Sequence, residues 1–129
     1  MKKILLFALT AMFAAACSQD AIVETAYQQG MMISIDETSK KWSDANSWCS
    51  NYGSGWYMPS ITELSTVYSK KSYINSALST LGKTTIGGKY WSAIRYDNSY
   101  YYIYNMDTGY SDSNGHYSNT YKVRVVREF

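Results

Sequence analysis

The sequence predicts an α+β domain, with helices in its first half and a sheet of tyrosine-rich strands in its second half. Apolar residues recur at helical spacing between about residues 41 and 81. After Gly87-Gly88, short runs of β-favouring residues alternate with turn residues as far as Phe129. The chain has 129 residues, which is enough for one domain with a modest core.

The first sixteen residues have the pattern of a secretory signal. A basic start (Lys2, Lys3) precedes an apolar run from Ile4 to Phe13, and three alanines precede Cys17. This run is too short for a stable membrane span. Small residues that end in Cys resemble the lipobox of bacterial lipoproteins, in which the Cys is lipidated and becomes the first mature residue. We therefore expect a lipoprotein signal peptide over residues 1–16 and lipid on Cys17, with an ordinary cleaved signal as the alternative.

The segment after Cys17 indicates where the protein works. Ser18, and not an aspartate that would retain a lipoprotein in the inner membrane, follows the Cys. We therefore expect an outer-membrane lipoprotein, exposed at the cell surface. Residues 17–29 are polar and are interpreted as a lipid-anchored tether, which leaves residues 30–129 for the folded domain. Without Lys2 and Lys3, ten basic residues face ten acidic ones, so no nucleic-acid partner is predicted.

The first half of the domain predicts a strand followed by helices. Residues 31–35 form a short apolar strand, and residues 36–39 form a turn. Trp42, Ala45 and Cys49 recur at helical spacing, which places them on the apolar face of a helix over residues 41–52. Gly53 ends this helix.

Two further helices are predicted before the sheet. Ser60 and Glu63 have the spacing of a capping box, in which each side chain accepts a hydrogen bond from the backbone of the other. The helix that they begin runs to Lys70-Lys71, whose charges suit a helix C-terminus. A shorter helix over residues 73–81 is closed by Gly82.

The last third of the chain is rich in tyrosine. Strands are predicted over residues 90–94, 100–106 and 121–127, with turns at 96–99 and 107–109 and a polar loop as far as Asn119. Nine of the fourteen tyrosines lie here among Asn, Ser, Asp and Gly, and this composition is typical of antibody combining loops. A hairpin-rich domain without a ligand would have the same composition, because Tyr favours strands and Asn, Asp and Gly favour turns.

Four motifs resemble a known family. The segments KKWSDANSWCSNYGSGWYMPSITELSTVY, KYWSAIRYDNSYYYIYNMDTGY and YKVRVVREF look like the pattern W-x-x-A-x-x-x-C, G-x-G-W-x-x-P-[ST]-x-x-E-L, Y-W-[ST]-S and V-R-x-V-R, in the same order. Ala93 stands at the last position of the third motif. They are similar to the bacterial domain named after the C-terminal domain of the Legionella collagen-like adhesin. That domain is close to the Fibrobacter major paralogous domain, and both are relatives of the C-type lectin-like fold. The resemblance covers about residues 30–129.

The resemblance implies a C-type-lectin-like fold, with two to three helices on a small, twisted, mostly antiparallel sheet and long C-terminal loops. The first and last strands would pair, and the irregular segments between the later strands would form the ligand face. In many relatives the Cys of the first helix bridges to the last strand, but Val125 stands at that place here. Cys49 is therefore expected to be a free buried thiol. The residues to which the resemblance gives a structural role are Trp42, Ala45, Cys49, Trp56, Pro59, Ser60, Glu63, Leu64 and Trp91.

Catalysis and metal binding are not expected. His116 is the one histidine and has no nucleophile motif beside it, and Cys49 lies on an apolar stripe without a base. Asp107, Asp112 and Asn114 could offer oxygen ligands to calcium. The Glu-Pro-Asn and Trp-Asn-Asp signatures of sugar-binding C-type lectins are missing, however, and the same spacing is common in turns. We expect no enzyme activity, no cofactor and no metal.

The expected function is adhesion through a surface rich in Tyr and Asn. Alternation along the strand over residues 100–106 places Tyr102, Tyr104 and Met106 on one face. Relatives carry bulky apolar residues there, so this face is expected to be buried, with Tyr101 and Asn105 on the other face. The ligand would be a carbohydrate or a surface protein, bound by Tyr96, Asp97, Asn98, Tyr101, Asn105, Tyr110, Asp112, Asn114, His116 and Tyr117.

Two alternatives remain from the sequence. One is a structural or tip subunit of a surface assembly such as a pilus, in which the tyrosines face a neighbouring subunit. The other is a display protein diversified by a retroelement, because such elements turn Asn codons into codons for Tyr, Ser, Asp, Gly and His. The sequence carries no signal for an oligomeric state.

Overall fold

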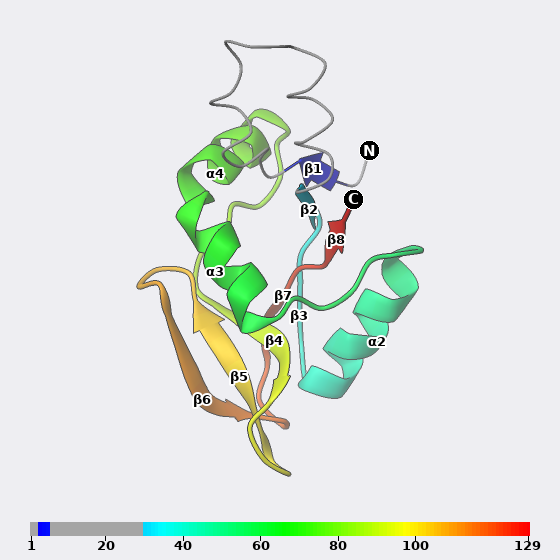
Figure 1. Ribbon diagram of the computed structural model, residues 1–129, viewed down its shortest axis with the longest axis vertical. Helices are drawn as coiled ribbons and strands as arrows, with labels where there is room; N and C mark the ends of the chain where they lie inside the picture. The colour runs from blue at the N-terminus through cyan, green and yellow to red at the C-terminus, as the bar shows by residue number, and fades with distance from the viewer. Residues whose placement is uncertain (1–2, 6–29) are drawn as a thin grey trace.

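The computed structural model describes residues 3–5 and 30–129, in which three helices pack on two sheets (Figure 1). This arrangement confirms the predicted α+β class. The smaller sheet has the order β1-β2-β8, and the larger one has the order β3-β7-β4-β5-β6. The strands are β1 (Lys3–Leu5), β2 (Met31–Ser34), β3 (Thr38–Lys40), β4 (Lys89–Arg95), β5 (Tyr100–Asn105), β6 (Tyr110–His116), β7 (Tyr121–Val123) and β8 (Val126–Glu128).

The structure does not describe residues 1–2 and 6–29. The predicted lipidation site Cys17, the predicted tether and the predicted signal peptide apart from residues 3–5 therefore lie outside the described part of the chain. Within the described part, no helix is long and apolar enough to cross a membrane.

The two ends of the folded domain lie side by side. Strand β2 pairs antiparallel with β8, with Met31 opposite Glu128 and Ile33 opposite Val126, as the family resemblance implies. The strand predicted over residues 121–127 is interrupted, because Val123 ends β7 and Val126 begins β8. The chain therefore passes from the larger sheet to the smaller one at residues 124–125.

The larger sheet is antiparallel except between β4 and β7, where Tyr90 lies opposite Lys122 in a parallel pair. Strands β4, β5 and β6 form a meander, and the register of β5 against β6 shifts between Tyr101 and Ile103. A shift of this kind marks a β-bulge, which bends the strand and increases its twist.

The helices are α2 (Trp42–Tyr52), α3 (Ile61–Ser69) and α4 (Lys71–Thr80). The predicted capping box is present: the backbone N–H of Glu63 donates to Ser60 Oγ at 3.2 Å, and that of Ser60 donates to Glu63 Oε1 at 2.9 Å. Helix α4 begins two residues earlier than predicted, directly after α3, so Lys71 lies at the start of a helix.

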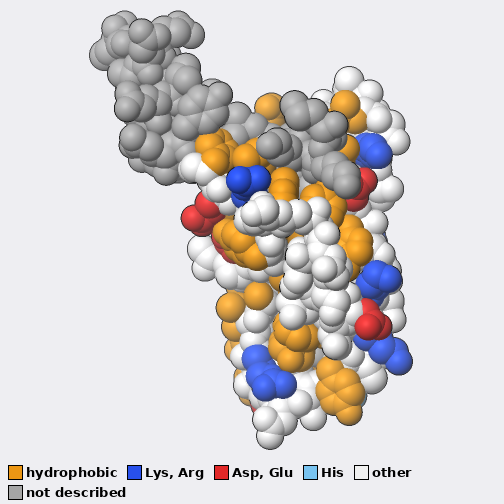
Figure 2. All heavy atoms as spheres, turned by 90° about the vertical axis from the view of Figure 1, so that its right-hand side faces the viewer, with side chains coloured by type: hydrophobic (Ala, Val, Ile, Leu, Met, Phe, Trp, Pro, Cys, Tyr) orange, Lys and Arg blue, Asp and Glu red, His pale blue; other side chains and the backbone are white. Residues whose placement is uncertain are grey.

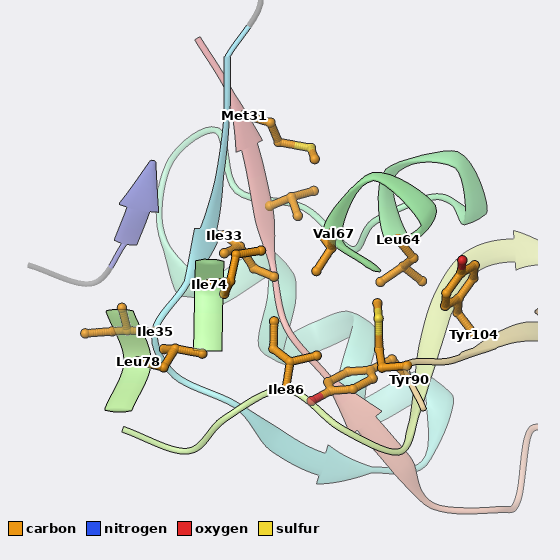
Figure 3. Packing of buried hydrophobic residues seen from close by; sticks show 12 residues of the cluster. Met31, Ile33, Ile35, Leu64, Val67, Ile74, Leu78, Ile86, Tyr90 and Tyr104 are labelled. Carbon is orange, nitrogen blue, oxygen red and sulfur yellow. The ribbon is translucent and has the colours of Figure 1, made fainter. Parts of the chain in front are cut away.

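Apolar side chains cover both faces of the larger sheet. Figure 3 shows the cluster beneath α3 and α4, where Leu64 and Val67 of α3 face Tyr90 and Tyr104 of the sheet. We call it the α3–α4 cluster; its members are Met31, Ile33, Ile35, Leu64, Val67, Ile74, Leu78, Ile86, Tyr90, Tyr104, Met106 and Val126. The α2 cluster lies on the other face; its buried members are Ala45, Cys49, Met58, Trp91, Tyr101, Ile103, Val123 and Val125, with Trp42, Trp48, Tyr52, Trp56 and Tyr121 packed against them.

Several of the motif residues are buried or hydrogen-bonded in the core. Trp91 is fully buried and donates from Nε1 to the carbonyl of Lys40 at 2.7 Å. Trp42 donates from Nε1 to the carbonyl of Ser92 at 3.0 Å. Cys49 is a free, buried thiol in the same cluster as Val125, as predicted from the sequence.

Two strands replace segments that were predicted to be irregular. Residues 110–116, predicted as a polar loop, form β6, whose residue Tyr110 lies opposite Asn105 and whose residue His116 lies opposite Tyr100. Residues 38–40, of which 38 and 39 were predicted within a turn, form β3 and pair with β7. Their Ser, Asp, Asn, Lys and Gly residues have low strand propensity, but backbone pairing with a formed neighbour overrides it.

Candidate functional site

The two faces of β5 are covered by different helices. Tyr101 and Ile103 belong to the α2 cluster, whereas Tyr104 and Met106 belong to the α3–α4 cluster. Because side chains alternate along a strand, Tyr100 and Tyr102 lie on the same face as Tyr104. They are nevertheless only half buried, since α3 does not cover this end of the sheet. The prediction that Tyr102 is a core residue was therefore wrong.

Tyr101 was predicted to contact a ligand, and the structure corrects this. Its side chain is 8% exposed. The ring stacks on Trp42 with centroids 3.9 Å apart and planes at 10°, and it meets Trp91 edge-on at 6.3 Å. The face that was expected to be open is covered by α2, so Tyr101 is part of the core.

Two turns meet at the uncovered end of the sheet, at the bottom of Figure 1. The backbone N–H of Tyr117, in the β6–β7 connection, donates to the carbonyl of Ser99, in the β4–β5 turn, at 3.0 Å. Within the β4–β5 turn, Asp97 Oδ1 accepts from the backbone N–H groups of Ser99 and Tyr100 at 2.8 and 2.9 Å. Both turns are therefore held in place by hydrogen bonds.

Aromatic rings from these turns and from β5 support one another, and we call them the tip cluster: Tyr96, Tyr100, Tyr102, His116 and Tyr117. Tyr96 meets Tyr102 edge-on at 5.7 Å, and Tyr100 meets His116 edge-on at 5.1 Å. His116 stacks on Tyr117 at 4.5 Å. Tyr96 and Tyr117 are 57% and 52% exposed. The tip cluster is thus an aromatic surface whose rings contact one another in pairs, and its outer residues Tyr96 and Tyr117 are exposed to solvent.

Polar side chains border the tip cluster. Asn98 is exposed in the β4–β5 turn, and Asn114 is exposed two residues before His116 on β6, so it lies on the same side of that strand. His116 Nδ1 accepts from the backbone N–H of Ser118 at 3.2 Å and lies 2.6 Å from its Oγ. Six of the ten predicted ligand-binding residues therefore lie in this region: Tyr96, Asp97, Asn98, Asn114, His116 and Tyr117.

Three other predicted residues lie at the opposite end of the β5–β6 hairpin. Asn105, Tyr110 and Asp112 line a shallow pocket of about 130 Å³, together with Lys89, Ile103, Thr108 and Ser111. Asn105 Oδ1 accepts from the backbone N–H of Asp107 at 2.8 Å, and Asp112 Oδ1 accepts from that of Asn114 at 2.6 Å. These side chains therefore already accept hydrogen bonds within the fold. The residues predicted to form one site lie in two separate places.

The structure adds the half-buried Tyr100 and Tyr102 to the tip cluster, whereas the prediction omitted the first and placed the second in the core. Their alternation with Tyr104 was visible in the sequence. The length of sheet that α3 covers could not be predicted from the sequence, because it depends on how the helix packs.

The comparison with known families decides what kind of chain this is. The model of one family, described as the Lcl C-terminal domain, matches residues 14–127. The chain belongs to this family. The match confirms the resemblance seen in the four sequence motifs. No match is found among curated proteins.

This Lcl C-terminal domain shares its fold with a solved structure, that of a fimbrial protein from Bacteroides ovatus, with a TM-score of 0.65. Sequence identity is 15%, and the alignment covers 99% of this chain and 44% of that one. The chain thus spans less than half the length of the fimbrial protein. At this identity the likeness concerns the fold.

The described residues of this Lcl C-terminal domain include one buried thiol, Cys49. Burial raises the pKa of the Cys49 thiol to about 12, so the group is protonated at neutral pH. Among residues 3–5 and 30–129, no three His, Cys, Asp or Glu side chains lie close enough to hold a metal ion. Asp107 Oδ1 accepts from the backbone N–H of Gly88 at 3.2 Å, whereas Asp112 Oδ1 accepts from that of Asn114. The two carboxylates thus each accept a backbone hydrogen bond, in different parts of the fold.

Proposed function

We propose that this Lcl C-terminal domain is a cell-surface adhesion module that binds its ligand through the tip cluster, without catalysis. The family and the fimbrial fold neighbour fit a surface adhesin or a pilus-like subunit. In this proposal Cys17 carries lipid, which anchors the domain to the outer membrane. The observation that supports the proposal is the pair of exposed tyrosines, Tyr96 and Tyr117, on two turns that hydrogen bonds hold together.

The ligand that fits the tip cluster best is a carbohydrate. The faces of exposed tyrosine rings suit the apolar face of a sugar, and the neighbouring Asn98 and Asn114 offer amide donors and acceptors to its hydroxyls. The rings already contact one another, so ligand binding would freeze little side-chain motion. The Asp97 carboxylate already accepts two backbone hydrogen bonds, so it is less available to select a cationic ligand.

A glycan array tests this proposal. The purified protein is expected to bind a defined set of glycans, and Tyr96→Ala with Tyr117→Ala is expected to remove that binding while the circular dichroism spectrum stays unchanged. Tyr73→Ala is the matched control, because Tyr73 on α4 is 59% exposed and belongs to no aromatic pair or cluster described above. Binding that survives the double change, or is lost equally with Tyr73→Ala, would exclude the tip cluster as the site.

A second candidate function is a subunit of a surface assembly, and one observation favours it. Strand β1, which lies within the expected leader, pairs antiparallel with β2, with Ile4 opposite Ile33. If the leader is removed, this edge of β2 would be open to a strand from another subunit, and such strand addition is a common mode of protein association. The apolar residues Met31, Ile33 and Ile35 lie along this segment.

The two candidates differ in the state of the protein on cells. An assembly subunit is expected to be recovered as a ladder of multiples of its own mass after gentle extraction and cross-linking. An adhesion module is expected to be recovered as a monomer that protease added to intact cells removes. A ladder that persists in the Tyr96→Ala/Tyr117→Ala variant would favour assembly through the β2 edge.

A further inference from the structure

A second pocket, remote in sequence from the tip cluster, lies between the β2–β3 connection and the last turns of α2. Its volume is about 430 Å³, and it is lined by Asp36, Glu37, Thr38, Trp48, Asn51 and Tyr52. None of these residues belongs to the tip cluster or to the pocket beside Tyr110. Ligand pockets for small molecules commonly have volumes of roughly 300–1,000 Å³, so this one is large enough for a single sugar residue.

The aromatic wall of the pocket is held in place. Trp48 is half buried against the α2 cluster, and its ring lies 5.2 Å from that of Tyr52. Tyr52 meets Trp56 edge-on at 5.2 Å and donates from its hydroxyl to Asp36 Oδ2 at 2.8 Å. This hydrogen bond ties α2 to the β2–β3 connection, so the two sides of the pocket keep their spacing without a ligand.

The charges that line the pocket are already compensated. Glu37 Oε1 accepts from Arg124 Nε at 2.9 Å and from the Tyr90 hydroxyl, and Lys122 Nζ lies 3.9 Å from Oε2. Asp36 Oδ1 lies 3.8 Å from the exposed Lys83 Nζ. Each of the two carboxylates thus has a cationic partner, so the pocket has no unpaired negative charge that would select a cationic ligand.

Polar groups with free capacity remain around Trp48. A carboxylate has about four acceptor positions, of which Asp36 uses one on Tyr52 and shares a second in a long ion pair. Asn51 is exposed on the last turn of α2, and Thr38 is half buried at the start of β3. On the face of the molecule that carries α2, Figure 2 shows hydrophobic side chains in separate spots among polar ones. A hydroxylated ligand suits this face better than a large apolar partner.

We propose that this pocket binds one neutral pyranose sugar residue, with the apolar face of the ring against Trp48 and its hydroxyls hydrogen-bonded to Asp36, Asn51 and Thr38. A neutral sugar combines an apolar face with many donors and acceptors, and this is the combination that the pocket presents. The proposal does not depend on the tip cluster, because the two sites share no residue.

Saturation-transfer NMR on the purified full-length protein tests the proposal, with a panel of methyl glycosides of glucose, galactose, mannose and N-acetylglucosamine. We expect saturable binding of at least one glycoside. Asn51→Ala and Asp36→Asn are each expected to weaken it roughly tenfold, the loss that corresponds to about one hydrogen bond. Asn51 is exposed on a helix, so its change to Ala is compatible with folding, which circular dichroism verifies.

Two controls make the result decisive. The Tyr96→Ala/Tyr117→Ala variant is expected to bind the same glycoside with unchanged affinity, which separates this pocket from the tip cluster. Tetramethylammonium is expected not to compete. The proposal is overturned if no glycoside binds saturably, if Asn51→Ala leaves the affinity unchanged, or if tetramethylammonium displaces the sugar.

Discussion

At the scale of single residues, Arg124 connects the parts of the fold. Its side chain is 1% exposed and lies between β7 and β8, where the chain leaves one sheet for the other. The guanidinium donates to Glu37 Oε1 and to the carbonyl of Ser34, each at 2.9 Å, and to the carbonyl of Thr84. The planar fork of Arg can serve three acceptors in different directions, which the ammonium of Lys cannot do in the same geometry.

Replacing Arg124 is therefore expected to destabilise the domain strongly. Arg124→Met leaves the Glu37 carboxylate without its main partner, and removing one member of a buried ion pair costs about 3–5 kcal/mol. Urea unfolding measures the loss. Lys89→Met is the control, because Lys89 is exposed, and it is expected to change the free energy of unfolding by less than about 0.5 kcal/mol. Equal losses in the two variants would contradict the role assigned to Arg124.

The buried thiol of Cys49 gives a second prediction at this scale. Burial raises its pKa from 9.0 to about 12. In the unfolded chain the thiol loses its proton at lower pH than in the folded one, so stability is fully present below pH 9 and falls as the pH rises from 9 to 12. Tyrosines with raised pKa values add to this fall.

Comparison of the wild type with Cys49→Ala isolates the contribution of the thiol to the pH dependence of stability. The free energy of unfolding of the wild type is expected to fall more steeply between pH 9 and pH 11 than that of Cys49→Ala. Native Cys49 is also expected to resist iodoacetamide at pH 8 and to react once urea unfolds the protein, as peptide mass mapping shows. Parallel pH curves for the two proteins would argue against the buried, protonated thiol.

At the scale of elements, β6 explains why part of the fold could be predicted from sequence and part could not. The helices were predictable, because Trp42, Ala45 and Cys49 repeat at helical spacing and Ser60 with Glu63 marks a start. Strand β6 was missed because residues 110–116 are polar and lie at the edge of the sheet, where no apolar alternation is needed. Tyr101 was misplaced for a related reason: its alternation was correct, but the helix that covers its face is set by tertiary packing.

The close fit of β6 against β5 depends on Gly115. A Cβ at this buried position would lie 2.6 Å from the carbonyl oxygen of Tyr101 and 2.8 Å from the ring of Trp91. Gly115→Ala is expected to destabilise the domain by about 1–3 kcal/mol, because backbone cannot give way as a flexible side chain can. Thermal unfolding measures this. Gly87→Ala is the matched control, since its nearest neighbour would be at 3.5 Å, and a larger loss there would refute the argument.

At the scale of the whole molecule, the two clusters share one sheet. Strand β5 gives Tyr101 and Ile103 to the α2 cluster and Tyr104 to the α3–α4 cluster. All four tryptophans of the chain belong to the α2 cluster. Tryptophan fluorescence therefore reports one face of the sheet, while the helices α3 and α4 lie on the other.

Because the sheet is common to both clusters, we expect them to unfold together. The denaturant midpoints from tryptophan fluorescence and from helical circular dichroism should coincide. Leu78→Ala, in the α3–α4 cluster, is expected to cost about 2–5 kcal/mol and to move both midpoints by the same amount. A shift in circular dichroism alone would show that the two clusters unfold separately.

The antiparallel pair of β2 and β8 has a mechanical consequence under the proposed function, in which the domain is anchored at one end and binds its ligand at the other. The described chain enters the pair at Gly30, beside the C-terminus, whereas the tip cluster lies at the far end of the long axis (Figure 1). A pull between these two points runs along β2 and not across it. The hydrogen bonds between β2 and β8 are then loaded in shear, so they must break together, where a pull across the strands would open them one by one. The β2–β8 pair is therefore expected to resist a pulling force better than strands that are pulled apart sideways.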